Sequence, residues 1–260
     1  MTKDYFYDNY RMTDFYDDMY TYTEDLNLWY DFITEKTKLL EIACGSGRMT
    51  LPILNKYPNI SLTGLDYSQE MLDLLKNKTR NQYPNLRIKN ADMRNFDLEE
   101  KYDVIIIASN SLNHIETYDD LEMVLSKVGE HLKKDGYLLI DILNPNPKFY
   151  IRDENKKYDF QVFKQSKTGR YFSFEESNKY DVANQMNYVR YYFRYCDKDG
   201  NSIDSNEYIM DLKVRLYFPQ EMDYILEKNN WIIEGKYDWY DKRNFEGKTR
   251  EQIYILRKKN

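Results

Sequence analysis

The chain has 260 residues, with 38 Lys and Arg against 44 Asp and Glu, for a formal net charge of -6. This length allows one large domain, or a core with an inserted subdomain, and either can bury a substantial core. Phosphate recognition needs clustered positive charge, so the acidic balance and the lack of a basic stripe argue against nucleic acid as the main partner.

Cysteine usage and the first residues indicate the compartment. Cys44 and Cys196 are too few and too far apart in sequence for a disulfide framework or a zinc site, so we expect free thiols and no metal. The chain starts with aspartates and aromatic residues where a signal peptide would be basic and then apolar. No apolar run reaches the length of a membrane span. We therefore expect a cytoplasmic protein without a membrane partner.

Residues 1–36 are acidic and rich in aromatic side chains. Leu26, Trp29, Tyr30 and Ile33 fall at helical spacing, which predicts a helix that packs on the core. The residues before them show no such periodicity. We expect this earlier part to fold over a ligand as a lid.

From Lys38 onward, strand and helix patterns alternate. Strands are predicted at 39–43, 61–65, 86–89, 104–108 and 137–143. Ser68 is placed to cap one helix, and Thr117 with Asp120 forms a capping box for another, which we expect to end near Lys134. This alternation predicts an α/β fold with a doubly wound sheet.

The pattern changes after residue 150. Residues 158–218 alternate polar and apolar, and Asp199 with Gly200 is a hairpin signal, so we expect an inserted antiparallel β subdomain. A helix and two further strands then complete the sheet, at 220–229, 231–237 and 252–256. The predicted organisation is an aromatic lid and helix at 1–36, a core of 37–150 with 219–260, and an insertion at 151–218 that serves as substrate cover or dimer contact.

A glycine-rich loop follows the first core strand. Gly45 and Gly47 allow a sharp turn and a close approach to a nucleotide at the carboxyl edge of a parallel sheet. The dinucleotide fingerprint requires a third small residue, and Thr50 stands there, which weakens a nicotinamide interpretation without excluding it. Counted from Ala43, the loop reads small-x-Gly-x-Gly and is preceded by Glu41, which is a different motif.

Residues 41–48 resemble motif I of the class I S-adenosylmethionine-dependent methyltransferases, and the segments 65–72, 90–93 and 136–141 resemble the later motifs in register. The chain is most similar to small-molecule enzymes of the glycine and amino-sugar N-methyltransferase kind. That resemblance implies a Rossmann-like, mostly parallel seven-stranded sheet. It also implies S-adenosylmethionine as methyl donor and S-adenosylhomocysteine as product. Ala43 departs from the glycine of many members, and no clear arginine for the cofactor carboxylate is found.

The resemblance also implies roles for individual residues. Asp66 would accept from both ribose hydroxyls, or else only cap the following helix. Asp92 would accept from the adenine amino group, with Met93 beside the ring. Tyr16 and Tyr20 would cover the cofactor and stabilise its sulfonium by cation–π attraction. The whole expected cofactor set is Tyr16, Tyr20, Glu41, Ala43, Gly45, Gly47, Arg48, Asp66, Tyr67, Met71, Asp92, Met93 and Asn110.

His114 lies past the fourth strand, in the loop that faces the substrate in this class. It is the candidate catalytic base, with a hydrogen bond to the backbone as the equal alternative. His131 is expected to sit on a helix dipole. We expect methylation of a small molecule, an amine rather than an oxygen acceptor, by a monomer or homodimer. The alternatives are an O-methyltransferase, a non-catalytic S-adenosylmethionine-binding regulator and a nicotinamide-dependent oxidoreductase.

Overall fold

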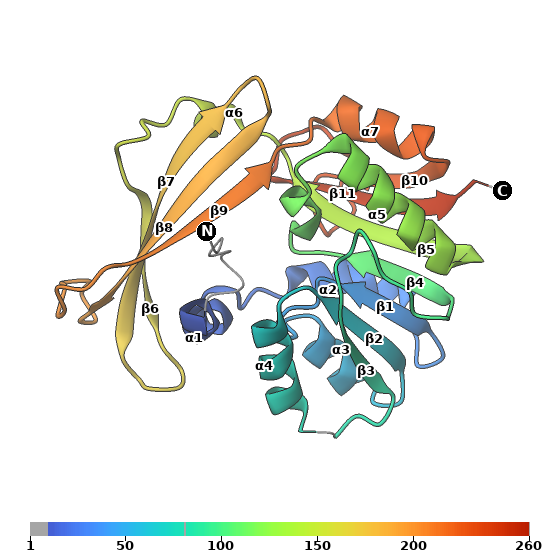
Figure 1. The fold of residues 1–260 in the computed structure, drawn as a ribbon, viewed down its shortest axis with the longest axis horizontal. Coiled ribbons are helices and arrows are strands. Elements are labelled where there is room, and N and C mark those ends of the chain that lie inside the picture. The colour runs from blue at the N-terminus through green and yellow to red at the C-terminus, as the bar shows by residue number, and fades with distance from the viewer. Residues whose placement is uncertain (1–9, 81, 260) are drawn as a thin grey trace. The chain divides into compact units, whose positions relative to one another are not determined.

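The computed structural model describes residues 10–80 and 82–259. They form two compact units (Figure 1). The first, here called the insertion unit, draws on Met1–Thr21 and Asn146–Arg215. The second, the core unit, consists of Tyr22–Pro145 and Leu216–Asn260.

The core unit is built on a seven-stranded sheet in the order β10-β11-β5-β4-β1-β2-β3. Neighbouring strands from β3 to β5 pair in parallel, whereas β11 is antiparallel to both β5 and β10. The strands are β1 (Lys38–Ile42), β2 (Ser61–Asp66), β3 (Leu86–Asn90), β4 (Tyr102–Ile107), β5 (Leu132–Leu143), β10 (Trp231–Tyr237) and β11 (Glu251–Lys258). The predicted fold class is confirmed, and the two late strands complete this sheet, with β11 as its antiparallel strand.

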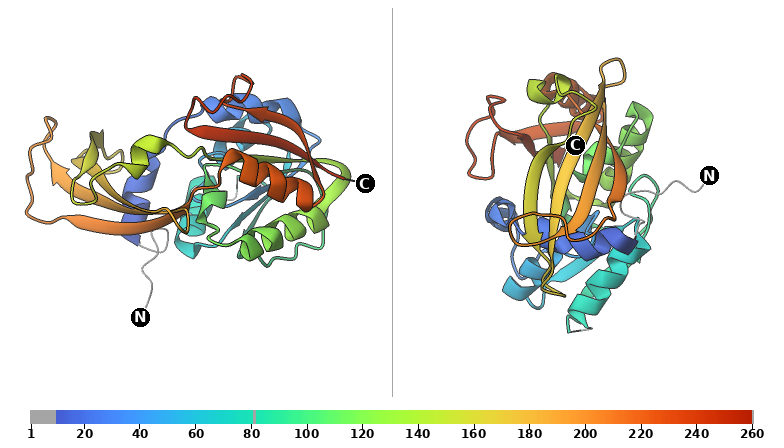
Figure 2. Two further views of the ribbon diagram at one scale, coloured as in Figure 1. Left: turned by 90° about the horizontal axis from the view of Figure 1, so that it is seen from above. Right: turned by 90° about the vertical axis from the view of Figure 1, so that its left-hand side faces the viewer.

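Helices cover both faces of this sheet (Figures 1 and 2). The helices α5 (Tyr118–His131) and α7 (Pro219–Lys228) bury their apolar side chains against one face. The helices α2 (Glu24–Trp29) and α3 (Thr50–Lys56) pack on the other. Leu26, Trp29 and Ile33 are buried there, and the predicted helix is present. It is shorter than its spacing suggests, because α2 ends at Trp29, the 3-10 helix η2 (Tyr30–Phe32) follows, and Ile33 has an extended backbone.

Local signals in the sequence fix where several helices begin. Ser68 accepts from the amide of Met71 and caps α4 (Gln69–Thr79), and Thr117 accepts from Asp120 and caps α5. Both caps were predicted.

The predicted end of α5 near Lys134 was wrong. The helix ends at His131, and β5 begins at once with Leu132, which pairs with Tyr102 of β4. Residues that were predicted to form the helix end and a turn are therefore part of a strand. Gly136 lies within this strand. A Cβ at this position would come within 2.8 Å of the Asp103 carbonyl, which explains why the residue is a glycine.

The insertion unit holds a four-stranded antiparallel sheet in the order β6-β7-β8-β9. Its elements are α1 (Tyr10–Met19), α6 (Pro147–Tyr150), β6 (Tyr158–Lys164), β7 (Tyr171–Asp181), β8 (Met186–Cys196) and β9 (Tyr208–Arg215). Phe15 of α1 packs against Phe172 and Phe193 with ring centroids 4.7 and 4.9 Å apart. Residues 10–19 thus form a helix although no helical periodicity was found there, because Phe15 packs on an apolar face of the antiparallel sheet. The first nine residues of the expected lid lie outside the described part.

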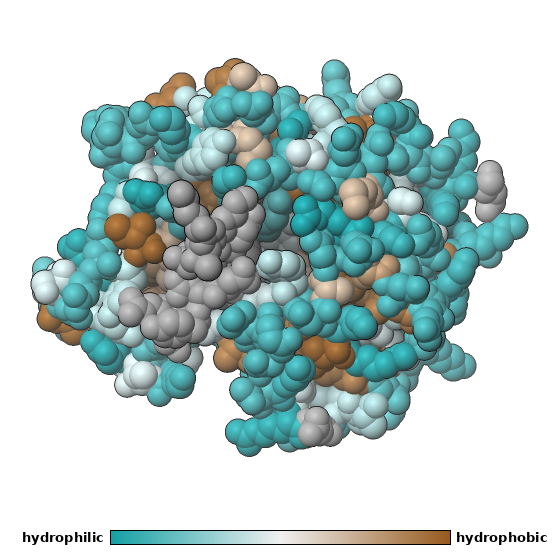
Figure 3. Space-filling view, in the orientation of Figure 1, coloured by the Kyte–Doolittle hydropathy of each residue, from teal (hydrophilic) through white to brown (hydrophobic). Residues whose placement is uncertain are grey.

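The surface in Figure 3 is mostly hydrophilic, with small separate hydrophobic areas. The large exposed apolar side chains are spread over both units and include Tyr67, Ile151, Val182 and Tyr224. Within residues 10–80 and 82–259, no helix is long and apolar enough to cross a membrane.

Candidate functional site

The loop after β1 is tied to the carboxyl end of β2. The amide of Cys44 donates to the carbonyl of Leu65 at 3.0 Å, and the amide of Gly45 donates to Oδ2 of Asp66 at 2.7 Å. The other oxygen of Asp66 accepts from the amide of Ser68 at 2.8 Å. One carboxylate therefore holds two loops at the sheet edge where the sequence predicts a nucleotide. Each of its oxygens can still accept a further hydrogen bond.

The two glycines of the loop serve different purposes. Gly47 has φ +92°, and a Cβ there would lie 2.5 Å from Cδ1 of Leu75 on α4. Gly45 has φ +53°, but a Cβ there would meet no heavy atom within 4 Å. Gly47 thus lets α4 pack closely, whereas Gly45 borders open space. Ala43 adopts φ +59°, a left-handed backbone conformation, and turns the chain just after β1.

Two buried side chains support this loop from below. Glu41 of β1 is 4% exposed, and its Oε2 accepts from the hydroxyl of Thr50 at 2.6 Å. Burial raises the pKa of Glu41 to about 7, although the Thr50 hydrogen bond opposes the shift. Cys44 packs with Leu72 and Leu75 of α4, and burial raises the pKa of its thiol well above the usual value.

The end of β3 contributes Asp92, whose carboxylate pairs with Arg94. Nε and Nη2 of Arg94 donate to Asp92, the shortest at 2.5 Å, and this bond lowers the pKa of Asp92. Sequence reasoning assigned Asp92 to the adenine amino group and did not expect Arg94 as its partner. The adenine role stays a prediction. Met93 beside it is partly buried against the core.

Other residues of the predicted cofactor set fall in different surroundings. Tyr67 follows Asp66 and is 61% exposed, whereas Met71 is 1% exposed within α4. Tyr16 and Tyr20 belong to the insertion unit, where their rings pack on each other at 4.6 Å. Their role over the cofactor stays a prediction.

Arg48 anchors a buried polar cluster that sequence reasoning missed. Its guanidinium makes a two-pronged pair with Asp25 of α2, at 3.1 and 2.6 Å, and Asp25 is fully buried. It also donates to the hydroxyl of Ser109 at 2.5 Å and to the carbonyl of Tyr22. The predicted cofactor residue Arg48 is thus also a structural link between α2, the glycine loop and the loop after β4.

The loop after β4 is fixed to the end of β5. Asp141 of β5 accepts from the amide of Asn110 at 2.7 Å through Oδ1, and from the hydroxyl of Tyr240 at 3.0 Å through Oδ2. Ser109 and Asn110 both have φ +60°, a left-handed backbone that non-glycine residues adopt rarely and that concentrates at functional sites. Asn110, a predicted cofactor residue, therefore lies beside the buried cluster.

His114 ends the short helix η3 (Ser111–His114) in this loop and is partly buried. The loop is held there because the amide of Leu143 donates to Asn113 at 2.9 Å, and the hydroxyl of Tyr217 donates to the carbonyl of Ile115 at 2.6 Å. Its position past β4 is the predicted one, and its role as a base stays a prediction.

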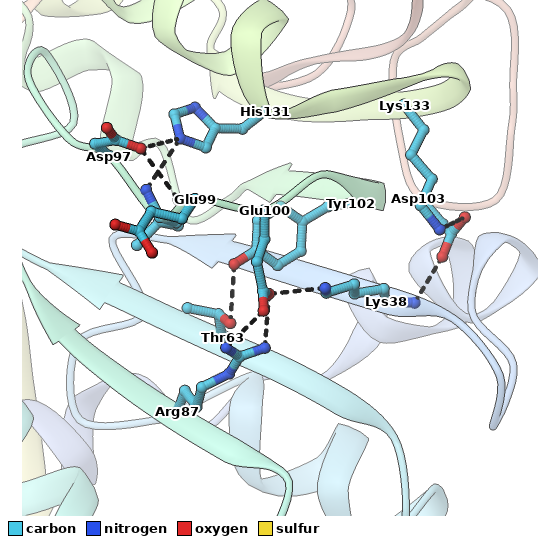
Figure 4. Close-up of polar contacts among 11 residues, drawn as sticks. Lys38, Thr63, Arg87, Asp97, Glu99, Glu100, Tyr102, Asp103, His131 and Lys133 are labelled. Carbon is cyan, nitrogen blue, oxygen red and sulfur yellow. Dashed lines mark hydrogen bonds and ion pairs between the residues drawn. The ribbon is translucent and has the colours of Figure 1, made fainter.

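His131 lies at the other edge of the sheet, where β4 and β5 begin (Figure 4). Its Nε2 accepts from the amide of Leu98 at 3.1 Å, and Nδ1 lies 2.8 Å from the carbonyl of Lys127. The carboxylate of Asp97 lies 3.7 Å from Nε2. His131 thus links the last turn of α5 to the loop before β4. Among the described residues, no group of three or more His, Cys, Asp and Glu side chains could hold a metal.

Comparison with known proteins identifies this arrangement. Residues 39–136 match a family described as a methyltransferase domain. The chain is 23% identical to an S-adenosylmethionine-dependent methyltransferase of Clostridium acetobutylicum, covering 96% of this chain and 98% of that one, with a TM-score of 0.75. Residues 39–136 therefore carry a methyltransferase domain, and the chain has the fold of the S-adenosylmethionine-dependent methyltransferases.

Other relatives of this methyltransferase differ in acceptor. It is 34% identical over 102 residues to malonyl-(acyl-carrier protein) O-methyltransferase of Bacillus anthracis, covering 39% of this chain and 36% of that protein. A sugar N-methyltransferase of Streptoalloteichus has the same fold, with a TM-score of 0.68 at 16% identity, over 91% of this chain and 87% of that one. The chain spans about half the length, or less, of the first curated relatives that it matches.

The residues of the core unit suit S-adenosylmethionine. The ionised carboxylate of Asp66 can accept hydrogen bonds only, as a ribose diol requires. The space beside Gly45 would be filled by any Cβ at that position, so the loop leaves room for a ligand against its backbone.

Proposed function

We propose that the protein transfers the methyl group of S-adenosylmethionine to a small-molecule acceptor. The observation that carries this proposal is the link from Gly45 to Asp66, at the carboxyl edge of a sheet with the strand order of the class I methyltransferases. The bound cofactor supplies a methyl group already activated on a sulfonium. The remaining work of the chain is to align the acceptor and to exclude water.

In this proposal the carboxylates at the ends of β2 and β3 orient the adenosine. Asp66 accepts from the ribose hydroxyls, and Asp92 accepts from the adenine amino group while Arg94 fixes its orientation. The backbone of Ala43, Gly45 and Gly47 approaches the methionine part, and Tyr67, Met71, Met93 and Asn110 line the site. Tyr16 and Tyr20 are the aromatic residues proposed to stabilise the sulfonium by cation–π attraction.

An amine is the preferred acceptor class. A sugar N-methyltransferase shares both the fold and most of the chain length, which supports this preference. An amine must lose a proton before it can attack a methyl group, and His114 is the group proposed to accept that proton. An O-methyltransferase is the second candidate, favoured by the malonyl-(acyl-carrier protein) relative.

Calorimetry with S-adenosylmethionine tests the foundation of the proposal. Saturable binding to the folded protein is expected, and its absence would contradict the proposal. A turnover screen of amines, amino acids, amino sugars and phenols, read by release of S-adenosylhomocysteine, then tests catalysis. Cofactor binding without turnover on any acceptor would favour a regulator that only binds the cofactor.

A further inference from the structure

The buried cluster beyond Arg48 extends to the last strand of the sheet. Glu251 begins β11, opposite Leu143 of β5, and is 1% exposed. Nε of Arg250 donates to its Oε1 at 2.7 Å. Burial is the main cause that raises the pKa of Glu251, and the charge of Asp141 adds to it. The charge of Asp25 raises the pKa of Asp141, and the charge of Arg48 lowers it. These side chains therefore form one electrostatic group.

Charges in this group do not balance. It contains the carboxylates of Asp25, Asp141 and Glu251, and the guanidinium groups of Arg48 and Arg250. Asp25 uses both oxygens on Arg48, and Asp141 uses both on Asn110 and Tyr240. With all five side chains ionised, the group lacks one positive charge. Buried carboxylates are costly unless a cation and hydrogen-bond donors compensate them.

Two buried oxygen atoms in the group have no hydrogen-bond donor from the described chain. They are Oε2 of Glu251 and Oδ1 of Asn110. The two side chains are neighbours at the end of β5: the backbone amide of Asn110 is bound to Asp141, and Glu251 pairs with Leu143, two residues further along the same face of that strand. The side chain of Asn110 also lowers the pKa of Glu251. Two neighbouring acceptors with one uncompensated negative charge match a cation that carries N–H donors.

We propose that Glu251 and Asn110 form a subsite that binds the acceptor through a protonated primary or secondary amine. This inference rests on the proposed function and names its substrate class. The ammonium donates to Oε2 of Glu251 and Oδ1 of Asn110, while Arg250 holds Oε1 and keeps the carboxylate oriented. Glu251 recognises the acceptor in this scheme, and His114 remains the proton acceptor.

The α-ammonium of the cofactor is a second candidate to occupy this subsite, because the proposed function places it at the same edge of the sheet. A purely structural ion pair with Arg250 is the third interpretation. The three differ in what the substitution Glu251→Gln changes. It removes the charge but keeps the shape and an acceptor for Arg250.

The experiment uses the full chain saturated with S-adenosylhomocysteine, whose binding is first measured by calorimetry. Benzylamine, ethanolamine and glucosamine are then titrated by saturation-transfer NMR, each beside its neutral counterpart, benzyl alcohol, ethylene glycol and glucose. At least one amine is expected to bind saturably while its counterpart does not. Glu251→Gln is expected to weaken the binding of that amine about 10- to 100-fold, because a charge-assisted hydrogen bond is lost. Its affinity for S-adenosylhomocysteine should be unchanged.

The control is Glu100→Gln, which removes a carboxylate paired with Arg87 and Lys38 at the opposite edge of the sheet (Figure 4) and should leave amine binding unchanged. Asn110→Ala is a second test if Glu251→Gln does not fold; because Asn110 is also a proposed cofactor residue, this variant is compared only at saturating S-adenosylhomocysteine, where it should weaken binding of the same amine several-fold. Three results would overturn the inference: no amine binds, the amine binds both variants as tightly as wild type, or the affinity of Glu251→Gln for S-adenosylhomocysteine falls together with its affinity for the amine. If wild type does not bind S-adenosylhomocysteine, the proposed function fails instead.

Discussion

Gly45 and Asp66 are joined by a hydrogen bond of 2.7 Å from backbone amide to carboxylate. The bond fixes the glycine loop after β1 to the end of β2. A carboxylate held in this way is already oriented, so less conformational entropy is lost when a ligand binds to it. The loop and the acid therefore act as one preformed unit.

Asp66→Ala should weaken binding of S-adenosylmethionine strongly. We expect a loss of about 10- to 100-fold for each hydrogen bond from the ribose that disappears, since hydrogen bonds to charged groups contribute about 1.5–3 kcal/mol. Isothermal calorimetry measures the change. Asp73→Ala, on the exposed face of α4, is the matched control and should bind as wild type does. Equal affinity of the two variants would contradict the role of Asp66.

The two loop glycines should respond differently to alanine. Gly47→Ala places a Cβ 2.5 Å from Leu75 and should destabilise the fold, as over-packing does, by about 1–3 kcal/mol or more. Gly45→Ala meets no neighbour and should cost only the backbone strain, about 1–2 kcal/mol. Because its Cβ projects into open space, Gly45→Ala should remain folded and yet bind S-adenosylmethionine poorly. Denaturant unfolding and calorimetry of both variants separate the two effects. A folded Gly45→Ala with wild-type affinity would show that the cofactor does not approach this residue.

The sequence was sufficient to predict the core unit because its signals are local. The strand at 231–237 and the cap at Ser68 follow from periodicity and capping chemistry, which depend on neighbouring residues alone. Two features that depend on long-range contacts were not predicted. Residues 132–136 are strand because Tyr102 pairs with Leu132. Residues 10–19 are a helix whose Phe15 packs against Phe172 and Phe193.

The buried polar cluster could not be predicted for the same reason. Asp25 is one of several acids in the first segment, and nothing local distinguishes it from an exposed one. Glu251 reaches the cluster only through the register of β11 on β5, which is not visible in sequence spacing. Asp141 did carry a signal, since an acid inside the apolar run 138–143 requires a buried partner.

The ion pair between Arg48 and Asp25 should contribute far more to stability than an exposed pair of similar geometry. Arg48→Met leaves the fully buried Asp25 without a cation, and we expect a loss of about 3–5 kcal/mol. Arg190 and Asp211 form an equally two-pronged pair on the exposed strands β8 and β9. Arg190→Met should cost about 1 kcal/mol or less. Denaturant unfolding of both variants tests the contrast, and similar losses would contradict it.

The two histidines should differ in what their loss affects. On the first acceptor found, His114→Ala should lower kcat about 10²- to 10⁴-fold without changing affinity for S-adenosylmethionine, as expected for loss of a general base. His131→Ala removes the acceptor for the Leu98 amide and should lower stability while kcat per folded molecule is kept. Turnover of His114→Ala equal to wild type across pH 6–9 would reject His114 as the base.

Glu41 should make the protein less stable as the pH rises toward neutrality. Burial raises its pKa from the usual 4.5 to about 7, so between these values the folded chain keeps a proton that the unfolded chain has lost. Unfolding is then favoured by increasing pH, at about 1.4 kcal/mol per pH unit for one such group, and the dependence ends above the folded pKa.

Glu41→Gln tests this linkage. The amide still accepts from the Thr50 hydroxyl and cannot ionise, so the part of the slope between pH 4.5 and 7 that belongs to Glu41 should disappear. At pH 8 the variant should be more stable than wild type by a few kcal/mol, because wild type must then bury a charge that burial opposes. Denaturant unfolding at half-unit steps from pH 5 to 8 measures both slopes. Parallel curves for the two proteins would mean that Glu41 is ionised throughout this range. In that case Arg48, whose charge lowers the pKa of Glu41, would have a stronger influence than burial.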